Sequence, residues 1–368
     1  MKIDDKTSHN SPSLRFPEFT GEWERCVLGD VLEFSNTRIN SSELNSGNYV
    51  STENILQNFQ GIVKARSIPE DTNVMAFSCG NILLSNIRPY LKKVWKATFN
   101  GGCSSDVFVL QANSNIDADY LHYVVANDKF IGFVMNGAKG VKMPRGDKNQ
   151  MKTYSLSLPS IKEQRKISRF LSFLDERIAV QNRLIDRLQS LMIGIAQKIA
   201  HSNKPNVRIS DCLECSSSAL QESEVNKTGK YPVYGANGIV GYIDKYHTQN
   251  EAIYIIKDGS GVGGVSYVTG KCSSTGTLNI LQAKNGHSLK YLYYLLKVFN
   301  FVPYKTGMAI PHIYFKDYGK AKIFCPAYPE QLEYVKLLSS IDGNLRIALD
   351  SLKNFNLQKQ YLLRHMLI

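Results

Sequence analysis

The sequence predicts an α+β protein in which two mixed α/β domains are separated by two long antiparallel coiled-coil helices. Two observations predict this class. Each half of the chain ends in a long segment whose apolar residues recur at alternating steps of four and three, which is the spacing of a coiled-coil seam. The two segments also match each other 167 positions apart, so that Leu171 corresponds to Leu338.

The predicted seam comprises, in the first helix, Leu171, Leu174, Ile178, Ile185 and Leu188 and, in the second helix, Leu338, Ile341, Leu345, Leu352 and Phe355. The first helix carries the chain from the first domain to the second, and the second helix leaves the second domain at the equivalent point. If the two stripes pack together within one chain, they must run antiparallel, which predicts an internal pseudo-twofold repeat. The alternative is that each helix pairs with another protein or with a second copy.

The ends of the helices set the expected domain boundaries. We expect a first domain at 1–158, a first helix at 159–202, a second domain at 203–325 and a second helix at 326–368. Ser160 and Glu163 have the spacing of a capping box. Pro329 suits the first turn of the second helix, where its missing N–H costs nothing. A helix of about 38 residues rises ~57 Å, which is enough to hold two domains apart.

The interiors of the two domains are related but unequal. Apolar runs rich in β-branched residues predict buried strands at 107–111, 252–257 and 278–282. Asp117 and Ser288 are the expected N-caps of one helix in each domain. Both domains contain a Cys-Ser-Ser tripeptide, beginning at Cys103 and at Cys272, but the interiors differ in length and content. This pattern is typical of two related domains that recognise two different targets.

Composition favours an anionic partner. The 368-residue chain has a formal net charge of +12, which suits nucleic acid. The alternative is a basic surface with no specific partner. The polar segment 1–10 is not expected to be a secretory signal, and no stretch reaches the roughly 18–20 apolar residues of a membrane span. We therefore expect a cytoplasmic protein with no membrane association.

The seven cysteines do not suggest a disulfide framework in a chain of this length. Cys212 and Cys215 form the one Cys-x-x-Cys pair, and no second pair follows at the spacing of a zinc site. Alignment of the two halves places Cys212 opposite Val31, so it is expected to act as a small hydrophobic residue. We expect no metal site.

Basic clusters supply the candidate DNA contacts. Lys and Arg side chains neutralise phosphates and can also reach guanine edges in the major groove. The candidates are Arg88, Lys92, Lys93, Lys96, Lys139, Lys142, Arg145 and Lys148 in the first domain, and Lys257, Lys305, His312 and Lys316 in the second. The alternative for each cluster is a solvated loop without a ligand.

Motifs for catalysis and for nucleotide binding are missing. The glycine-rich residues 259–264 precede a predicted strand at 265–268 rather than a helix, and Gly270-Lys271 lacks the earlier glycine of a phosphate-binding loop. A tight turn or a close backbone approach to DNA is the expected role of these glycines. Neither an adenine-methylation motif nor a His-Glu-x-x-His stands out. We expect no catalytic residue and no cofactor site, and therefore not an enzyme.

Three signatures resemble the specificity subunit of a Type I restriction–modification system, and the resemblance runs nearly end to end. They are the opening segment 12–23 followed by Leu28-Gly29-Asp30, the twin junctions 158–164 and 326–331 ahead of the long helices, and the segment 231–235 with the glycine loop that follows it. Two features depart from the family pattern. Each junction has a single proline ahead of the helix approach, and Lys257 stands where many relatives have arginine.

The resemblance implies a non-catalytic subunit with two target-recognition domains. Each domain is expected to read one half of an asymmetric bipartite site on double-stranded DNA, while the helices set the spacing and help to dock partners. The implied partners are two methyltransferase (modification) subunits and the restriction subunits that carry the motor and nuclease. S-adenosylmethionine, ATP and Mg²⁺ are expected on those partner subunits and not on this chain.

Two other functions remain open from the sequence. A self-contained DNA enzyme is disfavoured by the missing motifs, and methylation or cleavage by the purified chain alone is the result that supports it. A coiled-coil assembly scaffold without sequence-specific DNA binding is the other alternative. A lack of preference between DNA sequences is the result that favours the scaffold.

Overall fold

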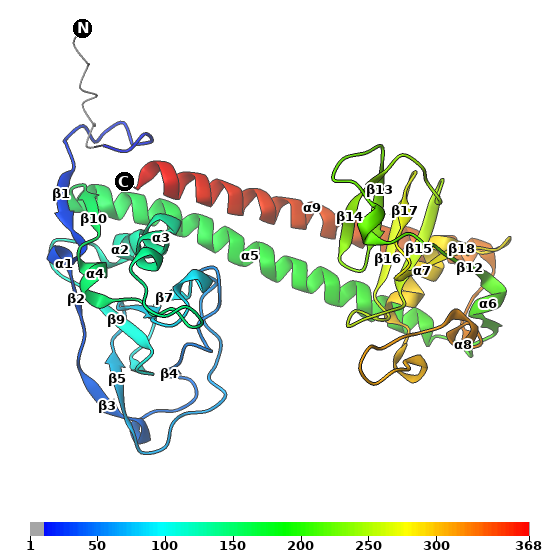
Figure 1. Ribbon diagram of the computed structural model, residues 1–368, viewed down its shortest axis with the longest axis horizontal. Coiled ribbons are helices and arrows are strands. Elements are labelled where there is room, and N and C mark those ends of the chain that lie inside the picture. The colour runs from blue at the N-terminus through cyan, green and yellow to red at the C-terminus, as the bar shows by residue number, and fades with distance from the viewer. Residues whose placement is uncertain (1–10, 368) are drawn as a thin grey trace, which may run out of the picture. The chain divides into compact units, whose positions relative to one another are not determined.

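The computed structural model describes residues 11–367, which divide into two compact units. Of the described residues, unit 1 contains 11–180 together with 352–367, and unit 2 contains 181–351. Each unit holds one mixed α/β domain and a part of each long helix (Figure 1). The predicted α+β class, with two mixed domains and two long helices, is confirmed. The segment 1–10, for which no secretory signal is expected, lies outside the described residues.

The domain of unit 1 is built on two four-stranded sheets. The first sheet is antiparallel and has the order β2 (Leu32–Phe34), β9 (Val107–Ala112), β6 (Ile82–Ser85) and β7 (Val94–Lys96). The second has the order β3 (Arg38–Asn40), β5 (Asn73–Phe77), β8 (Gly101–Cys103) and β4 (Tyr49–Val50), and its β4–β8 pair is parallel. Val107 to Leu110 are all buried, as the apolar run predicts for a strand covered on both faces.

Short helices and one strand pair complete this domain. The helices are α1 (Leu28–Val31), α2 (Ala118–Val125), α3 (Asp128–Asn136) and α4 (Lys148–Lys152), and the 3₁₀ turns are η1 (Ser41–Glu43) and η2 (Pro89–Leu91). Asp117 caps α2 as predicted, because its carboxylate accepts the backbone N–H of Tyr120 at 3.1 Å. Strand β1 (Glu24–Val27) pairs with β10 (Ser155–Leu158), so the domain's first strand lies beside its last.

The domain of unit 2 repeats the first sheet of unit 1 strand for strand. Its antiparallel order is β12 (Leu213–Ser217), β18 (Leu278–Ala283), β15 (Glu251–Ile256) and β16 (Val265–Thr269). A second sheet contains β14 (Gly238–Ile243), β13 (Tyr231–Gly235) and β17 (Ser273–Ser274), and β11 (Val207–Arg208) pairs with β19 (Lys322–Ile323). The helical elements are α6 (Ile209–Cys212), η3 (Glu222–Glu224), α7 (Leu289–Val298), η4 (Val302–Tyr304) and α8 (Phe315–Tyr318). Ser288 caps α7.

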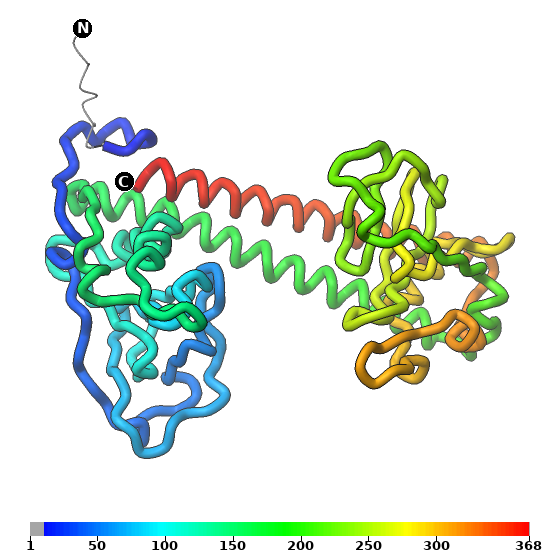
Figure 2. The backbone as a smooth tube through the Cα atoms, in the orientation of Figure 1, coloured from blue at the N-terminus to red at the C-terminus, as the bar shows by residue number. Residues whose placement is uncertain are grey.

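The long helices are α5 (Ile161–Ala200) and α9 (Tyr328–Met366), and they run antiparallel (Figure 2). In unit 1, Asp175 of α5 binds Lys359 near the end of α9. In unit 2, the Gln181 side chain of α5 donates to the carbonyl of Ala348 of α9 at 2.9 Å. Later positions of α5 therefore meet earlier positions of α9. All ten predicted seam residues are buried or half-buried.

A buried glutamine fixes the start of each long helix to its own domain. Gln164 accepts a hydrogen bond from the backbone N–H of Asp117 at 2.8 Å and donates to the carbonyl of Pro159 at 2.9 Å. Gln331 accepts from the N–H of Ser288 at 2.8 Å and donates to the carbonyl of Pro326 at 2.8 Å. Both glutamines are 1% exposed. Each therefore ties the N-cap of a domain helix to the root of a long helix.

Glu163 corrects one expectation. Its backbone N–H donates to the Ser160 hydroxyl at 3.4 Å, which is half of a capping box. Its carboxylate, however, accepts two hydrogen bonds from the Arg15 guanidinium, at 2.7 and 2.8 Å. The carboxylate is taken because the opening segment lies against α5, a long-range contact that local spacing does not reveal.

Among residues 11–367, no helix is both long and apolar enough to cross a membrane.

Removing Arg15 is expected to destabilise unit 1. Arg15→Ala leaves the Glu163 side chain, which is 2% exposed, buried without its partner, and should lower the free energy of unfolding by about 3–5 kcal/mol. Lys166→Ala is the matched control, because the Lys166–Glu18 pair is about half exposed and is worth ~0–1 kcal/mol. Urea unfolding measures both. An equal loss in the two variants contradicts this account of the buried pair.

Candidate nucleic-acid interface

Two loops of unit 1 that carry the predicted basic clusters lie against each other. We call residues 86–93 and 139–148 the first loop pair. The N–H of Arg88 donates to the carbonyl of Pro144 at 2.8 Å, and the N–H of Gly146 donates to the carbonyl of Asn86 at 3.0 Å. Lys139 and Arg145 are also bridged backbone to backbone, which closes the second loop into a hairpin. Two clusters that are separate in the sequence therefore form one surface.

Unit 2 builds the same arrangement at the equivalent positions. We call residues 257–264 and 305–316 the second loop pair. The N–H of Gly259 donates to the carbonyl of Pro311 at 3.0 Å, and the N–H of Ile313 donates to the carbonyl of Lys257 at 2.9 Å. Thr306 and His312 are bridged as Lys139 and Arg145 are. The backbone frame is thus repeated, whereas the side chains on it differ.

The cations of the first loop pair fall into two groups. Arg88, Lys139, Lys142 and Arg145 are exposed, and Lys139 pairs with Asp147 at 2.7 Å while Arg145 pairs with Asp106 at 2.8 Å. Lys92 is half-buried and pairs with Asp128 at 2.7 Å. These five cations lie on the loop pair, where a phosphate can compete for them.

The other three predicted cations of the first domain are held within it. The Lys93 ammonium donates to the carbonyl of Thr52, and burial lowers the pKa of Lys93. Lys96, at the end of β7, binds Asp119 of α2. The Lys148 ammonium lies 5.2 Å from the ring centre of Phe108. All three are half-buried, as Lys92 is, so the described structure exposes none of them as fully as it exposes Arg88.

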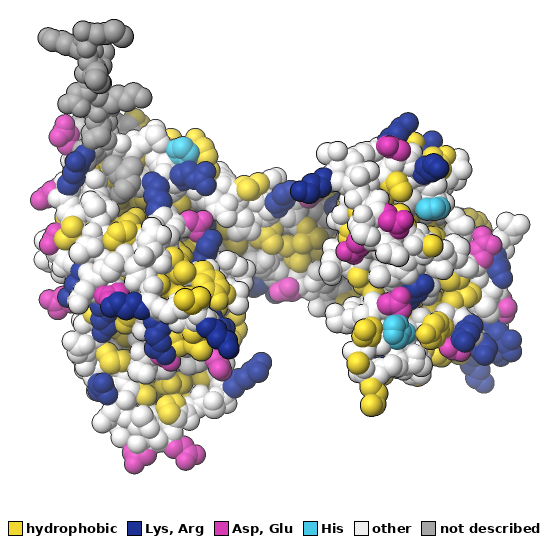
Figure 3. Space-filling model, in the orientation of Figure 1, with side chains coloured by type: hydrophobic (Ala, Val, Ile, Leu, Met, Phe, Trp, Pro, Cys, Tyr) yellow, Lys and Arg dark blue, Asp and Glu magenta, His cyan; other side chains and the backbone are white. Residues whose placement is uncertain are grey.

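The second loop pair is less basic and more aromatic. His312 binds Asp258 at 2.7 Å and stacks on Tyr314 at a ring separation of 6.5 Å. The Lys316 ammonium lies 5.3 Å from the same tyrosine ring. Lys305 and Lys316 are exposed, and Lys257 is half-buried. Figure 3 shows Lys and Arg side chains on the visible face of both units, with several close together on unit 1.

Apolar side chains stand at the tips of both hairpins, and the sequence analysis did not predict them. Val141 and Met308 occupy equivalent positions and are fully exposed, while Met143 and Ile310 are about half exposed. A repeated pattern could have revealed them, since Gly140 and Gly307 each begin a run of glycine, apolar, any residue, apolar and proline. An apolar side chain held in water at a loop tip is available to contact a ligand.

The backbone around η2 is strained. Arg88 and Lys92, at its two ends, have φ of 51° and 54°, in the left-handed region that L-residues rarely adopt. A third loop adds Asn58 and Phe59, whose N–H groups donate to the carbonyls of Leu91 and Lys92 at 3.1 and 3.0 Å. Both also have positive φ. No sequence signal marked these two residues, because their contacts come from distant parts of the chain.

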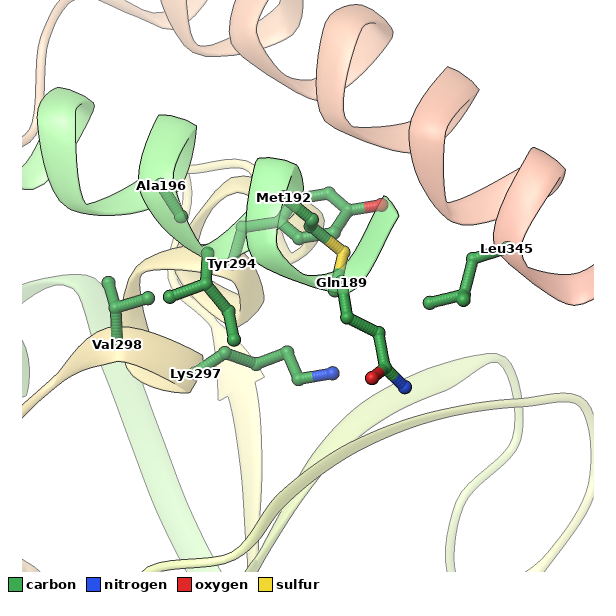
Figure 4. Close-up of a pocket in the computed structure, with 8 residues that line it drawn as sticks. Gln189, Met192, Ala196, Tyr294, Lys297, Val298 and Leu345 are labelled. Carbon is green, nitrogen blue, oxygen red and sulfur yellow. The ribbon is translucent and has the colours of Figure 1, made fainter. Parts of the chain in front are cut away.

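A small cavity in unit 2 lies among α5, α7 and α9 (Figure 4). It has a volume of about 200 Å³, and its lining includes Met192, Ala196, Tyr294 and Leu345, with the polar Gln189 and Lys297. Ligand pockets usually measure ~300–1,000 Å³. We assign this cavity to loose packing where the domain helix α7 meets the helix pair.

The strain at Arg88 predicts opposite effects at two equivalent positions. Arg88→Gly should leave stability unchanged or raise it by up to ~1 kcal/mol, because glycine adopts positive φ without strain. Gly259 has φ of 96° and open space where an alanine methyl group would lie, so Gly259→Ala should cost about 1–3 kcal/mol through the backbone alone. Thermal unfolding measures both. A clear loss of stability in Arg88→Gly contradicts the assignment of strain.

Comparisons with known proteins agree with this repeated frame. Residues 20–190 and 202–354 match the Type I restriction modification DNA specificity domain. The specificity subunit of the Type I restriction enzyme EcoDI of Escherichia coli is 29% identical over 126 residues, which are 33% of this chain and 28% of that protein. A putative type I specificity subunit of Mycoplasma pneumoniae is 23% identical over 278 residues, 70% of this chain and 71% of that protein. The match to EcoDI thus spans under a third of that relative's length.

Solved structures share the fold. The chain is similar to the S subunit of a Type I restriction–modification system from M. genitalium, with a TM-score of 0.68, 17% identity and coverage of 97% of this chain and 99% of that one. A chain from a structure of type I restriction–modification complex assembly and conformational transition matches with a TM-score of 0.54 and 17% identity over 93% of this chain and 96% of that one. At this identity the likeness shows the fold. Because the family match covers both halves of the sequence, the chain belongs to the Type I restriction–modification DNA specificity family.

Proposed function

We propose that the chain is the sequence-specific DNA-binding specificity subunit of a Type I restriction–modification complex, and that it is non-catalytic. Each target-recognition domain reads one half of an asymmetric bipartite site. The observation that carries this proposal is the repetition of the loop pair. The same backbone hydrogen bonds form in both units, but the side chains on the loops differ. A frame that recurs within one molecule while its exposed residues differ suits two readers of two unlike half-sites.

The chemistry of the two loop pairs supports different half-sites. The first presents guanidinium and ammonium groups, which bind phosphates and can donate to guanine O6 and N7. The second presents an imidazole, a stacked tyrosine and two lysines, which offer fewer charges and more flat apolar surface. The apolar tips Val141 and Met308 suit contact with thymine methyl groups or with an unstacked base step. The two domains therefore have unequal means of reading DNA.

The outer faces of the long helices support docking of partner subunits. Several apolar residues on α5 and α9 lie outside the predicted seam and are 37–66% exposed. In unit 1 they are Phe170, Phe173, Val180, Leu357 and Tyr361, and in unit 2 they are Leu184, Leu191, Ile193, Leu332, Leu337, Ile347 and Leu349. Hydrophobic side chains are visible along the helices in Figure 3. Methyltransferase subunits are the proposed occupants, and restriction subunits join through them. S-adenosylmethionine, ATP and Mg²⁺ belong to those partners.

The exposed helix faces also support the second candidate, an assembly scaffold that binds no DNA sequence specifically. The two functions differ in what the loop pairs do. If the loops do not contact DNA, removing their charge changes neither the affinity for DNA nor the salt dependence of that affinity.

Loss of loop cations is expected to weaken DNA binding and its dependence on salt. In Arg88→Gln/Lys142→Ala, the slope of log K against log salt should become shallower by ~0.9 for each phosphate that the variant no longer neutralises. Lys162→Ala, an exposed lysine in the first turn of α5, is the control and should leave the slope unchanged. Fluorescence anisotropy on duplex DNA at several salt concentrations measures the slope. Identical slopes for the wild type and the double variant favour the scaffold.

Adenine methylation should report a bipartite site. The chain is co-expressed with its modification subunit, and methylated adenines are mapped across the host genome. A motif of two specified halves around an unspecified gap is expected. Exchange of residues 1–158 for the first domain of another family member should change one half of the motif and leave the other and the gap unaltered. A change in both halves, or in neither, contradicts the modular interpretation.

The same co-expression tests docking. Leu184→Asp places a charge on the exposed face of α5 while leaving the seam intact, and should reduce co-purification of the modification subunit. Arg183→Asp, at an exposed polar position beside it, is the control.

A further inference from the structure

Three soft-ligand side chains meet in unit 2 although they are far apart in the sequence. Cys212 ends α6, His287 precedes the N-cap of α7, and Cys325 lies between β19 and α9. Their ligand atoms all lie within 4.8 Å of one another, and the Cys325 sulfur is 3.5 Å from Nδ1 of His287. Cys212 is 0% exposed and Cys325 is 7% exposed. This group plays no part in the DNA-reading surface described above.

The equivalent place in unit 1 is filled by an ordinary apolar cluster. Alignment by the repeat puts Val31 opposite Cys212, Ile116 opposite His287 and Leu158 opposite Cys325. All three belong to the hydrophobic core of unit 1. The surrounding backbone is the same, since the N–H of Asn113 donates to the carbonyl of Val31 at 3.0 Å and that of Lys284 donates to the carbonyl of Cys212 at 2.9 Å. One frame therefore holds aliphatic side chains in one domain and metal-ligand side chains in the other.

The separation of the Cys325 and His287 ligand atoms suits a tetrahedral ion. Zinc binds cysteine sulfur at about 2.3 Å and histidine nitrogen at about 2.0–2.1 Å, which places neighbouring ligand atoms roughly 3.5–3.8 Å apart. The distance of 3.5 Å from the Cys325 sulfur to Nδ1 of His287 falls in that range. Two cysteines and one histidine leave a fourth position for water.

Neighbouring groups hold the ligands in place. The side chain of Asn206 binds the backbone of Cys325 twice, accepting from its N–H at 2.8 Å and donating to its carbonyl at 2.7 Å. The amide of Gln331 donates to the Cys325 sulfur at 3.3 Å, and such an N–H···S contact stabilises the thiolate, the form that binds metal.

We propose that Cys212, His287 and Cys325 bind a thiophilic divalent ion, with Zn²⁺ as the best fit, at the root of the second long helix. The ion joins α6, the start of α7 and the approach to α9, and so fixes the second domain to its helix. In unit 1 the same junction is held by apolar packing. The proposal departs from the expectation of no metal site, which rested on the missing second cysteine pair and on the alignment of Cys212 with Val31. Cys215 lies on β12 and does not belong to the group.

The test is Co²⁺ and Zn²⁺ binding by the full chain, purified without a histidine tag and kept reduced. Co²⁺ should give the near-ultraviolet charge-transfer absorption of a cobalt–thiolate bond at about one ion per chain, and Zn²⁺ should displace it. Zn²⁺ should also raise the midpoint of thermal unfolding, and a chelator should reverse that rise.

Variants assign the ligands. Cys212→Ser and Cys325→Ser should each weaken the thiolate absorption, and His287→Ala should alter the ligand-field bands. The triple variant Cys212→Val/His287→Ile/Cys325→Leu carries the residues of unit 1, so it should fold yet show neither the absorption nor stabilisation by Zn²⁺. Cys215→Ser is the matched control, because it removes the nearby cysteine outside the group and should change nothing.

Two outcomes overturn the proposal. One is a fully reduced chain that gives no cobalt–thiolate absorption and no shift in unfolding with Zn²⁺. The other is absorption that survives in the triple variant or is lost in Cys215→Ser, since either places the ion elsewhere. Circular dichroism of each variant establishes that it is folded before metal is added.

Discussion

The fold of each unit depends on one buried amide at the root of its long helix. Gln164 and Gln331 each accept the N–H of a domain helix's N-cap residue and donate to the carbonyl of the proline that precedes the long helix. A buried group that loses its hydrogen-bond partner costs about 1–3 kcal/mol, so the amide keeps both partners only in one relative position. The domain and the helix it precedes are thereby fixed to each other. This contact explains physically why a glutamine follows the junction proline by five positions in both halves of the sequence.

The two units share a backbone frame but carry different side chains on their loops. The sheet order, the N-caps, the root glutamines and the backbone hydrogen bonds of the loop pairs recur in both units. The side chains on those loops do not recur: Arg145 is replaced by His312, and Arg88 by Gly259. Backbone hydrogen bonds place no demand on side-chain identity, so the loops can change their exposed residues without altering the frame. Such a division suits the recognition of two different half-sites that we propose for this chain.

The sequence predicted what local periodicity encodes and missed what long-range contacts decide. Both long helices could be predicted because the period of their apolar residues is visible in a short window, and the strands at 107–111 and 278–282 because each is a short continuous apolar run. The contact that brings the two basic clusters together could not be predicted, because it depends on the Arg88–Pro144 hydrogen bond between distant segments. Glu163 was expected to cap its own helix, and Arg15 takes its carboxylate instead. Cys212 was expected to be a small hydrophobic residue because it aligns with Val31, whereas His287 and Cys325 approach it from two other parts of the domain.

The charge of the first loop pair is largely neutralised in the free protein, and this bears on the DNA recognition proposed for it. Lys139, Arg145 and Lys92 each face an aspartate, and these pairs are at least partly exposed. Such pairs contribute ~0–1 kcal/mol, so a phosphate can displace the carboxylate at little cost. The displaced carboxylate then lies beside the DNA, where it is repelled by phosphates but can accept a hydrogen bond from the N4 amine of cytosine. A cation with an acidic neighbour therefore gains less binding free energy from a duplex of any sequence. That reduction is smaller where a cytosine amine donates a hydrogen bond to the displaced carboxylate. Under the proposed function, such ion pairs lower the general affinity for DNA and increase the discrimination between sequences.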